Sequence, residues 1–467
     1  MNNKVSRLEQ SGFFLGGVAD SLIYLTISTF LLFFYTDVFG ISPIVAGTLF
    51  LVARIWDAVN DPLLGTIADK TKTKWGSFRP YIMFGAIPLA VFAVLCFTVP
   101  DISNTGKIVW AYVTYIGMGM CYTIVALPSL SLLSASSQKT EERTLLSSSR
   151  SWGSMIGALL ATGSMLTLVQ LFGNGDSAKG YQLATVFFAV IAAAFFIYLG
   201  LVSKERVPVP KEQKVSTKEA MSLLSKNKPW IVLNIFFIAF FLWLVIFKSL
   251  GMYYFTYYIG DGLLFGTFNI VNNIPTLIVI PFIPKLNKYL EKKQILQLGA
   301  IVVGMSGVML MLAKTNVSIV MIAAGVNAVG MGMMHPIMWS MLPDTVEYGE
   351  WVGGKRIPGL TVSAASFAQK AAQGVAGWLA SIILVSIAFK AGADVQSATT
   401  QEGIYFWFSI VSILLGVVTV VVMHFYSLDE KTYQKILIEL KNRPVNDDSN
   451  SNESFTQPNL IPVGANE

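Results

Sequence analysis

Apolar runs long enough to cross a bilayer recur along nearly the whole chain of 467 residues. A membrane-spanning helix needs about 20 mostly apolar residues, because it rises about 1.5 Å per residue through a hydrocarbon core about 30 Å thick. Charged residues make up only 13% of the chain, about half the share found in an average soluble protein. We therefore predict an all-α polytopic membrane protein without a soluble catalytic domain. The twelve predicted transmembrane helices cover residues 12–36, 44–68, 80–100, 108–134, 150–172, 182–202, 229–258, 262–283, 295–313, 317–342, 360–389 and 403–426.

The distribution of positive charge predicts the orientation of these helices. Of the 33 Lys and Arg residues, 25 fall in the N-terminal leader, in the loops after even-numbered spans and in the tail, whereas four fall in the other loops and four within spans. Because positive residues accumulate on the cytoplasmic side, we expect both termini in the cytoplasm of a bacterial-type inner membrane. The net charge of +6 then reflects orientation in membrane lipid and does not indicate nucleic-acid binding.

A polar stretch at residues 203–228 divides the twelve spans into six and six. We predict an N-terminal six-helix half over 1–202, this cytoplasmic central loop, a C-terminal six-helix half over 229–426 and a cytoplasmic tail over 427–467. The tail is expected to be disordered from about residue 444, where Asn, Ser, Asp and Pro dominate. The arrangement resembles the major facilitator architecture, in which two halves surround a central cavity.

Asp57 and Asp61 lie one helical turn apart in the second span, on one helix face. A charge in hydrocarbon costs at least about 2.5 kcal/mol, so these acids need a cation, protons, a basic partner or a water-filled cavity. Asn60 adds a neutral oxygen, and two carboxylates with neutral oxygens suit a hard cation such as Na⁺. The same acids are equally suited to exchange protons. In the alternative interpretation, Asp57 or Asp61 pairs with Arg54 or a lysine and only stabilises the bundle.

Two lysines lie deep in other spans. Lys370 is in the eleventh span, within SAASFAQKAAQGVAG, where small residues let another helix approach closely. An ion pair with Asp57 or Asp61 across the two halves would neutralise it; alternatively, it reaches the cytoplasmic surface. Lys248 lies in the seventh span and is followed by three aromatic residues, which favours a structural or snorkelling role.

Polar and aromatic side chains in further spans are candidates for lining a substrate cavity. Arg150 opens the fifth span with Trp152 two residues later; a guanidinium binds anionic oxygens, and an indole stacks on the apolar face of a sugar. The alternative is that Arg150 marks the cytoplasmic end of its helix. His335 is typical of a packed residue rather than a proton relay, yet Trp339 one turn later makes a binding surface conceivable. The other candidates are Asp20, Tyr24, Tyr122 and Ser366.

Enzymatic chemistry is not indicated by any motif. The chain has no G-x-x-x-x-G-K-[ST] phosphate loop. Two His and two Cys residues, far apart in sequence, offer no metal-ligand cluster, and Cys96 and Cys121 are predicted to be buried thiols. We therefore expect no cofactor and no ATP hydrolysis, so that an ion gradient or the substrate gradient must drive any transport.

Five segments, taken together, resemble a known family. They are FFYTDVFGIS, GTLFLVARIWDAVNDPLLG, WGSFRP, MCYTIVALP and PDTVEYGEW, at residues 33–42, 47–65, 75–80, 120–128 and 343–351. They are similar to the glycoside–pentoside–hexuronide:cation symporters, the branch of the major facilitators that contains the melibiose and glucuronide carriers. The resemblance implies the twelve-helix major facilitator fold and secondary active transport of a glycoside, pentoside or hexuronide with Na⁺ or H⁺.

The resemblance also implies where the cation binds. In the family, the paired acids of span two and the lysine of span eleven form the cation site, and the matching residues here are Asp57, Asp61 and Lys370. Asn60 and Thr123 match residues near the sodium site of the melibiose carrier.

The sugar site departs from that of the melibiose carrier. Where that carrier has a Lys–Asp pair in span one, this chain has Asp20 and Ser21, and Ala126 and Leu130 replace an acid and a tryptophan near the proline of span four. The arginine of span five is kept as Arg150. We expect melibiose not to be a substrate, and an anionic sugar whose carboxylate binds Arg150 or the span-eleven lysine is one hypothesis. The alternative function is a uniporter or exporter of a sugar-derived product without ion coupling.

Overall fold

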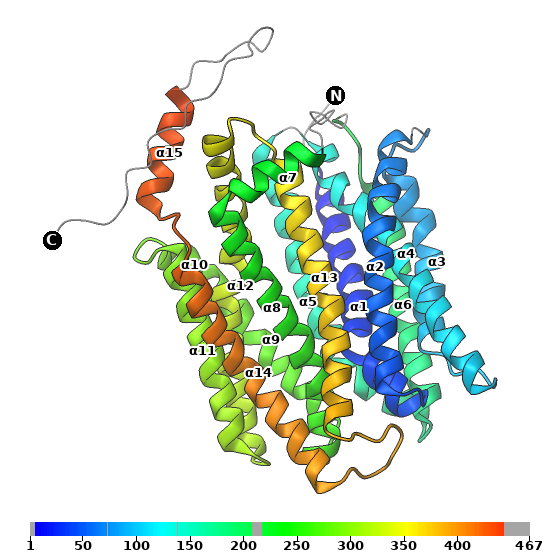
Figure 1. Ribbon diagram of the computed structural model, residues 1–467. Coiled ribbons are helices and arrows are strands. Elements are labelled where there is room, and N and C mark those ends of the chain that lie inside the picture. The colour runs from blue at the N-terminus through cyan, green and yellow to red at the C-terminus, as the bar shows by residue number, and fades with distance from the viewer. Residues whose placement is uncertain (1–4, 72, 138, 208–216, 443–467) are drawn as a thin grey trace, which may run out of the picture.

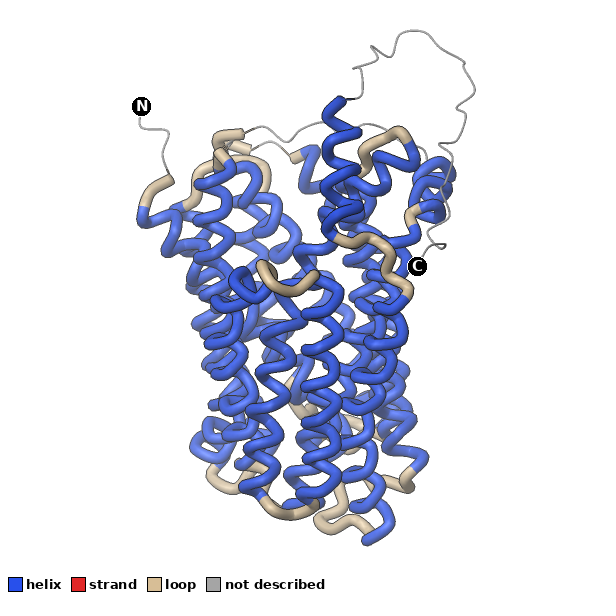
Figure 2. Tube along the Cα trace, turned by 90° about the vertical axis from the view of Figure 1, so that its left-hand side faces the viewer, coloured by secondary structure: helices blue, strands red, loops and turns tan. Residues whose placement is uncertain are grey.

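The computed structural model describes residues 5–71, 73–137, 139–207 and 217–442, and for some helix residues, Asp61 among them, the backbone alone. Long helices run along a common direction, and the described residues form no strand (Figures 1 and 2). The all-α prediction is confirmed. The α-helices are α1 (Arg7–Phe33), α2 (Pro43–Lys70), α3 (Arg79–Cys96), α4 (Asn104–Ser136), α5 (Thr140–Gly173), α6 (Ser177–Val202), α7 (Thr217–Lys226), α8 (Lys228–Tyr253), α9 (Leu264–Val279), α10 (Ile283–Leu286), α11 (Lys292–Ala313), α12 (Val317–Gly353), α13 (Pro358–Ser386), α14 (Ala398–His424) and α15 (Glu430–Asn442), with short π-helices η1 (Phe34–Val38) and η2 (Tyr254–Ile259) and a 3₁₀ turn η3 (Ile280–Phe282).

Ten helices among the described residues are long and apolar enough to cross a membrane. Two others of similar length, α2 and α13, complete the correspondence with the twelve predicted spans, although they are not among those ten. These two helices carry the acids and the lysine that the sequence singled out, and they pack against each other. The charged spans therefore meet at the contact between the two parts of the chain.

The bundle has two ends, which we name by the segments found there. The N-terminal end of α1, α7 and α15 lie at one end, the terminal face (Figure 1). The other end, at which α1 finishes and α2 begins, is the opposite face. The helix α7 lies in the predicted central loop, and α15 lies in the predicted tail. The tail segment that we expect to be disordered, from about residue 444, lies outside the described residues.

The helices α1 and α8 end in the same way, which shows a repeat between the two parts of the chain. Each continues into a π-helix, η1 or η2, and each π-helix leads to a glycine with φ of +83°, Gly40 or Gly260. A positive φ is strained for residues with a Cβ, so glycine is the residue that fits both turns. The matching sequences are FFYTDVFG at 33–40 and YYFTYYIG at 253–260.

Glycines bring α1 and α5 to backbone contact. A Cβ atom at Gly153 would lie 1.8 Å from the carbonyl oxygen of Phe14, and one at Gly17 would lie 2.1 Å from that of Arg150. Small residues of this kind allow helices in a membrane to pack closely. The contact fixes Arg150 on α5 beside α1.

We expect Gly153→Ala to destabilise the protein by about 1–3 kcal/mol, because the added methyl group forces two packed backbones apart. The measurement is thermal unfolding of the purified protein in detergent. The matched control is Gly325→Ala on α12, where no atom lies within 4 Å of the added Cβ. Equal unfolding temperatures for the two variants would contradict this packing.

At the opposite face, hydrogen bonds join the ends of α1 and α8. The hydroxyls of Thr36 and Tyr253 are 2.8 Å apart and buried, and the Tyr257 hydroxyl donates to Asp37. The ring of Phe33 packs against that of Tyr253 with 5.3 Å between centroids. These contacts close the opposite face between the first and second halves of the chain.

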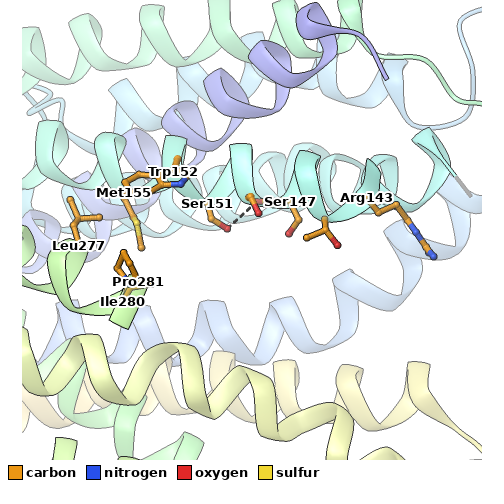
Figure 3. Close-up of a pocket in the computed structure, with 10 residues that line it drawn as sticks. Arg143, Ser147, Ser151, Trp152, Met155, Leu277, Ile280 and Pro281 are labelled. Atoms are coloured by element: carbon orange, nitrogen blue, oxygen red, sulfur yellow. Dashed lines mark hydrogen bonds between the residues drawn. The ribbon is translucent and has the colours of Figure 1, made fainter. Parts of the chain in front are cut away.

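The helices α5 and α9 also join the two halves, but along only part of their length. A Cβ atom at Gly266 of α9 would lie 2.8 Å from the carbonyl oxygen of Gly163 of α5. Toward the terminal face, the same helices border a cavity of about 540 Å³, lined by residues 143–155 and 277–281 (Figure 3). The structure is therefore closed at the opposite face and hollowed on the side of the terminal face.

Tyr253→Phe is expected to weaken this closure. Losing one buried hydrogen bond costs about 1 kcal/mol, which changes a two-state equilibrium about five-fold. The measurement is the rate at which a membrane-impermeant maleimide, added on the side of the opposite face, labels a cysteine placed at Ser28 in a background without the two native cysteines. Faster labelling is expected for Tyr253→Phe and an unchanged rate for Tyr258→Phe, whose ring stacks on α14 instead. Equal labelling rates for the two variants would show that the hydrogen bond between Thr36 and Tyr253 does not hold the opposite face closed.

Candidate functional site

The helix α2 places Arg54 against α13 and Asp57 against α4. Asp57 is buried, with 7% of its surface exposed. Its Oδ2 accepts a hydrogen bond of 2.8 Å from Nη1 of Arg54. Its Oδ1 faces α4, because a Cβ atom at Gly119 would lie 3.2 Å away. The pairing with Arg54 that the sequence left as an alternative is thus present in this state of the protein.

Two further residues predicted for the cation site lie next to this carboxylate. Asn60 follows Asp57 by nearly one turn, and Thr123 follows Gly119 by one turn on α4; both are buried. The Nδ2 atom of Asn60 is buried and has no hydrogen-bond partner among the described residues. The two ends of an amide are interchangeable in assignment, so Asn60 offers either a donor or an oxygen ligand there. Because an unsatisfied buried polar group costs about 1–3 kcal/mol, the site is suited to a ligand that satisfies it.

The proposed partner across the halves lies on α13. Lys370 precedes Gly374 by one turn, and a Cβ atom at Gly374 would lie 2.2 Å from Cγ of Arg54. The side chain of Asp61 is outside the described residues. The ion pair of Lys370 with Asp57 or Asp61 therefore stays a prediction, although the two helices that must supply it are in contact.

A second charged cluster joins α1, α4 and α5. Nη2 of Arg150 lies 3.3 Å from Oδ2 of Asp20, and Nη1 of Arg150 donates to Oγ of Ser129 at 2.8 Å. The Tyr122 hydroxyl donates to Oδ1 of Asp20 at 2.9 Å, and its ring lies 6.0 Å from that of Tyr24. Arg150 is therefore not a marker of a helix end. Its charge is already balanced by Asp20, so the hypothesis of a guanidinium available for a substrate carboxylate does not fit this state.

Trp152 lies apart from that cluster. It lines the large cavity between α5 and α9, together with Ser151 and Met155 on its own helix (Figure 3). Half of its surface is exposed. Residues two apart on a helix point in different directions, so the expected joint surface of Arg150 and Trp152 is wrong. Trp152 instead borders this cavity.

A smaller pocket lies at the centre, between the two halves. Its volume is about 40 Å³, which is room for about one water molecule. Tyr24 was a candidate from the sequence, and Arg54 was named there only as a structural partner of the acids, whereas Tyr115, Ser249 and Gln373 were missed. The available signal was the same for all three, a polar side chain within an apolar span. Arg54 thus belongs to both the carboxylate site and the central pocket.

The remaining candidates lie on α12 and α13. His335 is exposed, and its ring lies 6.4 Å from that of Phe240 on α8. Trp339 packs edge to face on Phe237, with 5.1 Å between centroids, and is only partly buried. Ser366 is partly buried one turn before Lys370.

Metal-ligand chemistry is not indicated by the described part of the chain, which contains no group of three His, Cys, Asp or Glu residues able to hold a metal ion. Cys96 and Cys121 are both buried free thiols, as predicted.

The sequence matches a family of known proteins along most of its length. Residues 12–430 match the family described as MFS/sugar transport protein. The uncharacterized symporter YnaJ of Bacillus subtilis (strain 168) is 36% identical, over 94% of this chain and 96% of that protein. The isoprimeverose transporter of Lactiplantibacillus pentosus is 35% identical, over 94% and 92%, and the glucuronide carrier protein homolog of Escherichia coli (strain K12) is 31% identical, over 95% and 97%.

Among solved structures, a D-xylose-proton symporter has a similar fold. The TM-score is 0.61 at 15% sequence identity, and the match covers 88% of this chain and 95% of that chain. At this identity the similarity concerns the fold alone. The resemblance inferred from the five sequence segments is confirmed by the family match and the relatives.

Proposed function

Because the chain belongs to the MFS/sugar transport protein family, we propose that it couples the movement of a glycoside, pentoside or hexuronide to that of a cation across a bacterial inner membrane. The family is one of membrane transporters, so the chain is a transporter and not an enzyme. The relatives named for isoprimeverose and glucuronide support a sugar-derived substrate. The observation that carries the coupling is the buried carboxylate of Asp57, one helical turn from the buried Asn60, whose Nδ2 has no hydrogen-bond partner among the described residues.

Arg54 connects the cation site to the central pocket. It pairs with Asp57 on one side, and on the other it lines the central pocket with Tyr24 and Gln373. A Na⁺ ion or a proton on Asp57 would compete with Arg54 for the carboxylate. The guanidinium would then be available to substrate oxygens in the pocket. Cation binding and substrate binding would thus favour each other.

The orientation of the protein in the membrane and the identity of the coupled ion depend on different residues. With both termini in the cytoplasm, as the charge distribution predicts, the terminal face is cytoplasmic and the structure is closed toward the outside. Carboxylate, amide and hydroxyl oxygens at Asp57, Asn60 and Thr123 suit Na⁺, while a carboxylate alone serves H⁺. Both ions are retained as candidates.

A second candidate function is uniport or export without ion coupling. The close pair of Arg54 and Asp57, 2.8 Å apart, favours it, because a permanent ion pair has no need of a cation. In that case Asp57 would stabilise α2 against α4 and α13 without exchanging ions.

Transport in proteoliposomes separates these functions. Purified protein is reconstituted, and uptake of isoprimeverose, xylosides, glucosides and glucuronides is measured under an imposed Na⁺ gradient, an imposed pH gradient or neither. We expect one gradient to drive accumulation of at least one glycoside above its external concentration. Equilibration of a glycoside without accumulation under either gradient would support the uniporter, and a lack of any glycoside transport would overturn the proposed function.

A further inference from the structure

Lys248 lies deep in the bundle, at a place where no side chain balances its charge. The sequence favoured a structural or snorkelling role, but the structure surrounds Lys248 with protein while leaving it partly accessible. Its ammonium makes no hydrogen bond or ion pair with any residue that the structure describes. A buried charge without a partner is costly, so such a group is expected to bind something in the working protein.

The other basic residues within spans are already engaged. Arg54 pairs with Asp57 at 2.8 Å, and Arg150 pairs with Asp20 at 3.3 Å. Lys370 also has an interaction partner. Lys248 differs from these three residues because it has no partner among the residues that the structure describes.

The charges within the spans also indicate a positive charge without a partner. The twelve spans contain four basic residues but only three acids, so one positive charge has no matching carboxylate. A coupling cation would add a further positive charge. An anionic substrate reduces this excess, whereas a neutral one leaves it in place. The basic residues within the spans are Arg54, Arg150, Lys248 and Lys370, and the acids are Asp20, Asp57 and Asp61.

Lys248 lies on α8 next to residues that line the central pocket. Val245 and Ser249, which flank it on α8, line the central pocket. His335, across on α12, is exposed, and its ring lies 6.4 Å from that of Phe240 on α8. An ammonium carries three N–H donors that can contact a carboxylate.

We propose that Lys248 binds the carboxylate of an acidic glycoside such as a uronide. The assignment rests on the symporter function proposed above and defines its substrate class. It also replaces Arg150 and Lys370, which the sequence offered for this role, by a lysine whose charge no described residue balances. A charge-assisted contact of this kind predicts that an acidic glycoside binds at least about 10-fold more tightly than its neutral counterpart.

The test compares matched ligands on the purified full-length protein. Dissociation constants are measured by isothermal titration for phenyl β-D-glucuronide against phenyl β-D-glucoside, and for glucuronosyl-xylobiose against xylobiose. We expect wild type to favour at least one acidic member about 10-fold or more. Lys248→Gln should lose most of that preference, and Lys248→Arg should keep it. The control Lys390→Gln, at an exposed lysine, should keep it as well.

Two outcomes would overturn the assignment. One is that no acidic ligand binds more tightly than its neutral counterpart to wild type. The other is that Lys248→Gln keeps the preference while remaining folded, as judged by thermal unfolding beside Lys248→Arg. Gradient-driven uptake of neutral glycosides would in either case leave the symporter function standing. Absence of any driven uptake would contradict symport, and the ratios of dissociation constants would still decide the role of Lys248.

Discussion

Asp57→Asn is expected to abolish gradient-driven accumulation while substrate binding and exchange partly survive. The amide keeps the shape of the carboxylate but neither releases a proton nor balances the charge of Na⁺. It also leaves Arg54 without the anion that it contacts at 2.8 Å in this structure. Asp61→Asn should behave in the same way. Uptake under a gradient and counterflow without one are the two measurements, made in the same proteoliposomes.

The matched control is Asp101→Asn, at an exposed aspartate outside the long helices. It should accumulate substrate as wild type does. If Asp57→Asn and Asp61→Asn also accumulate substrate at wild-type levels, the acidic pair is structural and the coupling mechanism is wrong. If a variant loses both counterflow and accumulation, the substitution has instead damaged the fold or the substrate site.

Arg150→Lys is expected to lower transport about 10-fold or more for neutral and acidic glycosides alike. Arg150 contacts Asp20 with one nitrogen and Ser129 with another. A lysine ammonium keeps the charge but cannot reproduce this forked contact, which is worth about 1.5–3 kcal/mol for hydrogen bonds to charged groups. Asp20 would then no longer be held where the Tyr122 hydroxyl reaches it.

The measurement is the initial rate of uptake of one neutral and one acidic glycoside. Arg7→Lys, at an exposed arginine, serves as the control and should transport at the wild-type rate. A loss confined to the acidic glycoside would show that Arg150 receives the substrate carboxylate, as the sequence led us to consider. That result would also weaken the assignment of Lys248.

The fold was predictable because hydropathy and helix length constrain a membrane protein strongly. Each predicted span lies on a long helix, including α2 and α13, whose charged residues make them less apolar. The repeat between 33–40 and 253–260 was missed, because the two segments share only eight positions and lie 220 residues apart. Only the matching π-helices and glycine turns make it visible.

The site was predictable only where its residues lie close together along the chain. Asp57 and Asn60 share one helix face, so their proximity follows from helix geometry. The partner of Arg150 was not predictable, because Asp20 lies 130 positions away and is brought near by the glycine contacts of α1 with α5. The role that we propose for Lys248 was not predictable for a related reason. Its neighbours in sequence are aromatic, and its neighbours in space cannot be deduced from them.

We expect the cation at Asp57 and the glycoside to favour each other's binding, because Arg54 pairs with Asp57 and also lines the central pocket. Linkage requires this effect to be reciprocal. The measurement is the dissociation constant of the glycoside at several Na⁺ concentrations and pH values, paired with that of Na⁺ with and without glycoside. We predict that one cation tightens glycoside binding, that the glycoside tightens binding of that cation by the same factor, and that Asp57→Asn removes both effects. Glycoside affinity independent of both Na⁺ and pH would contradict the account.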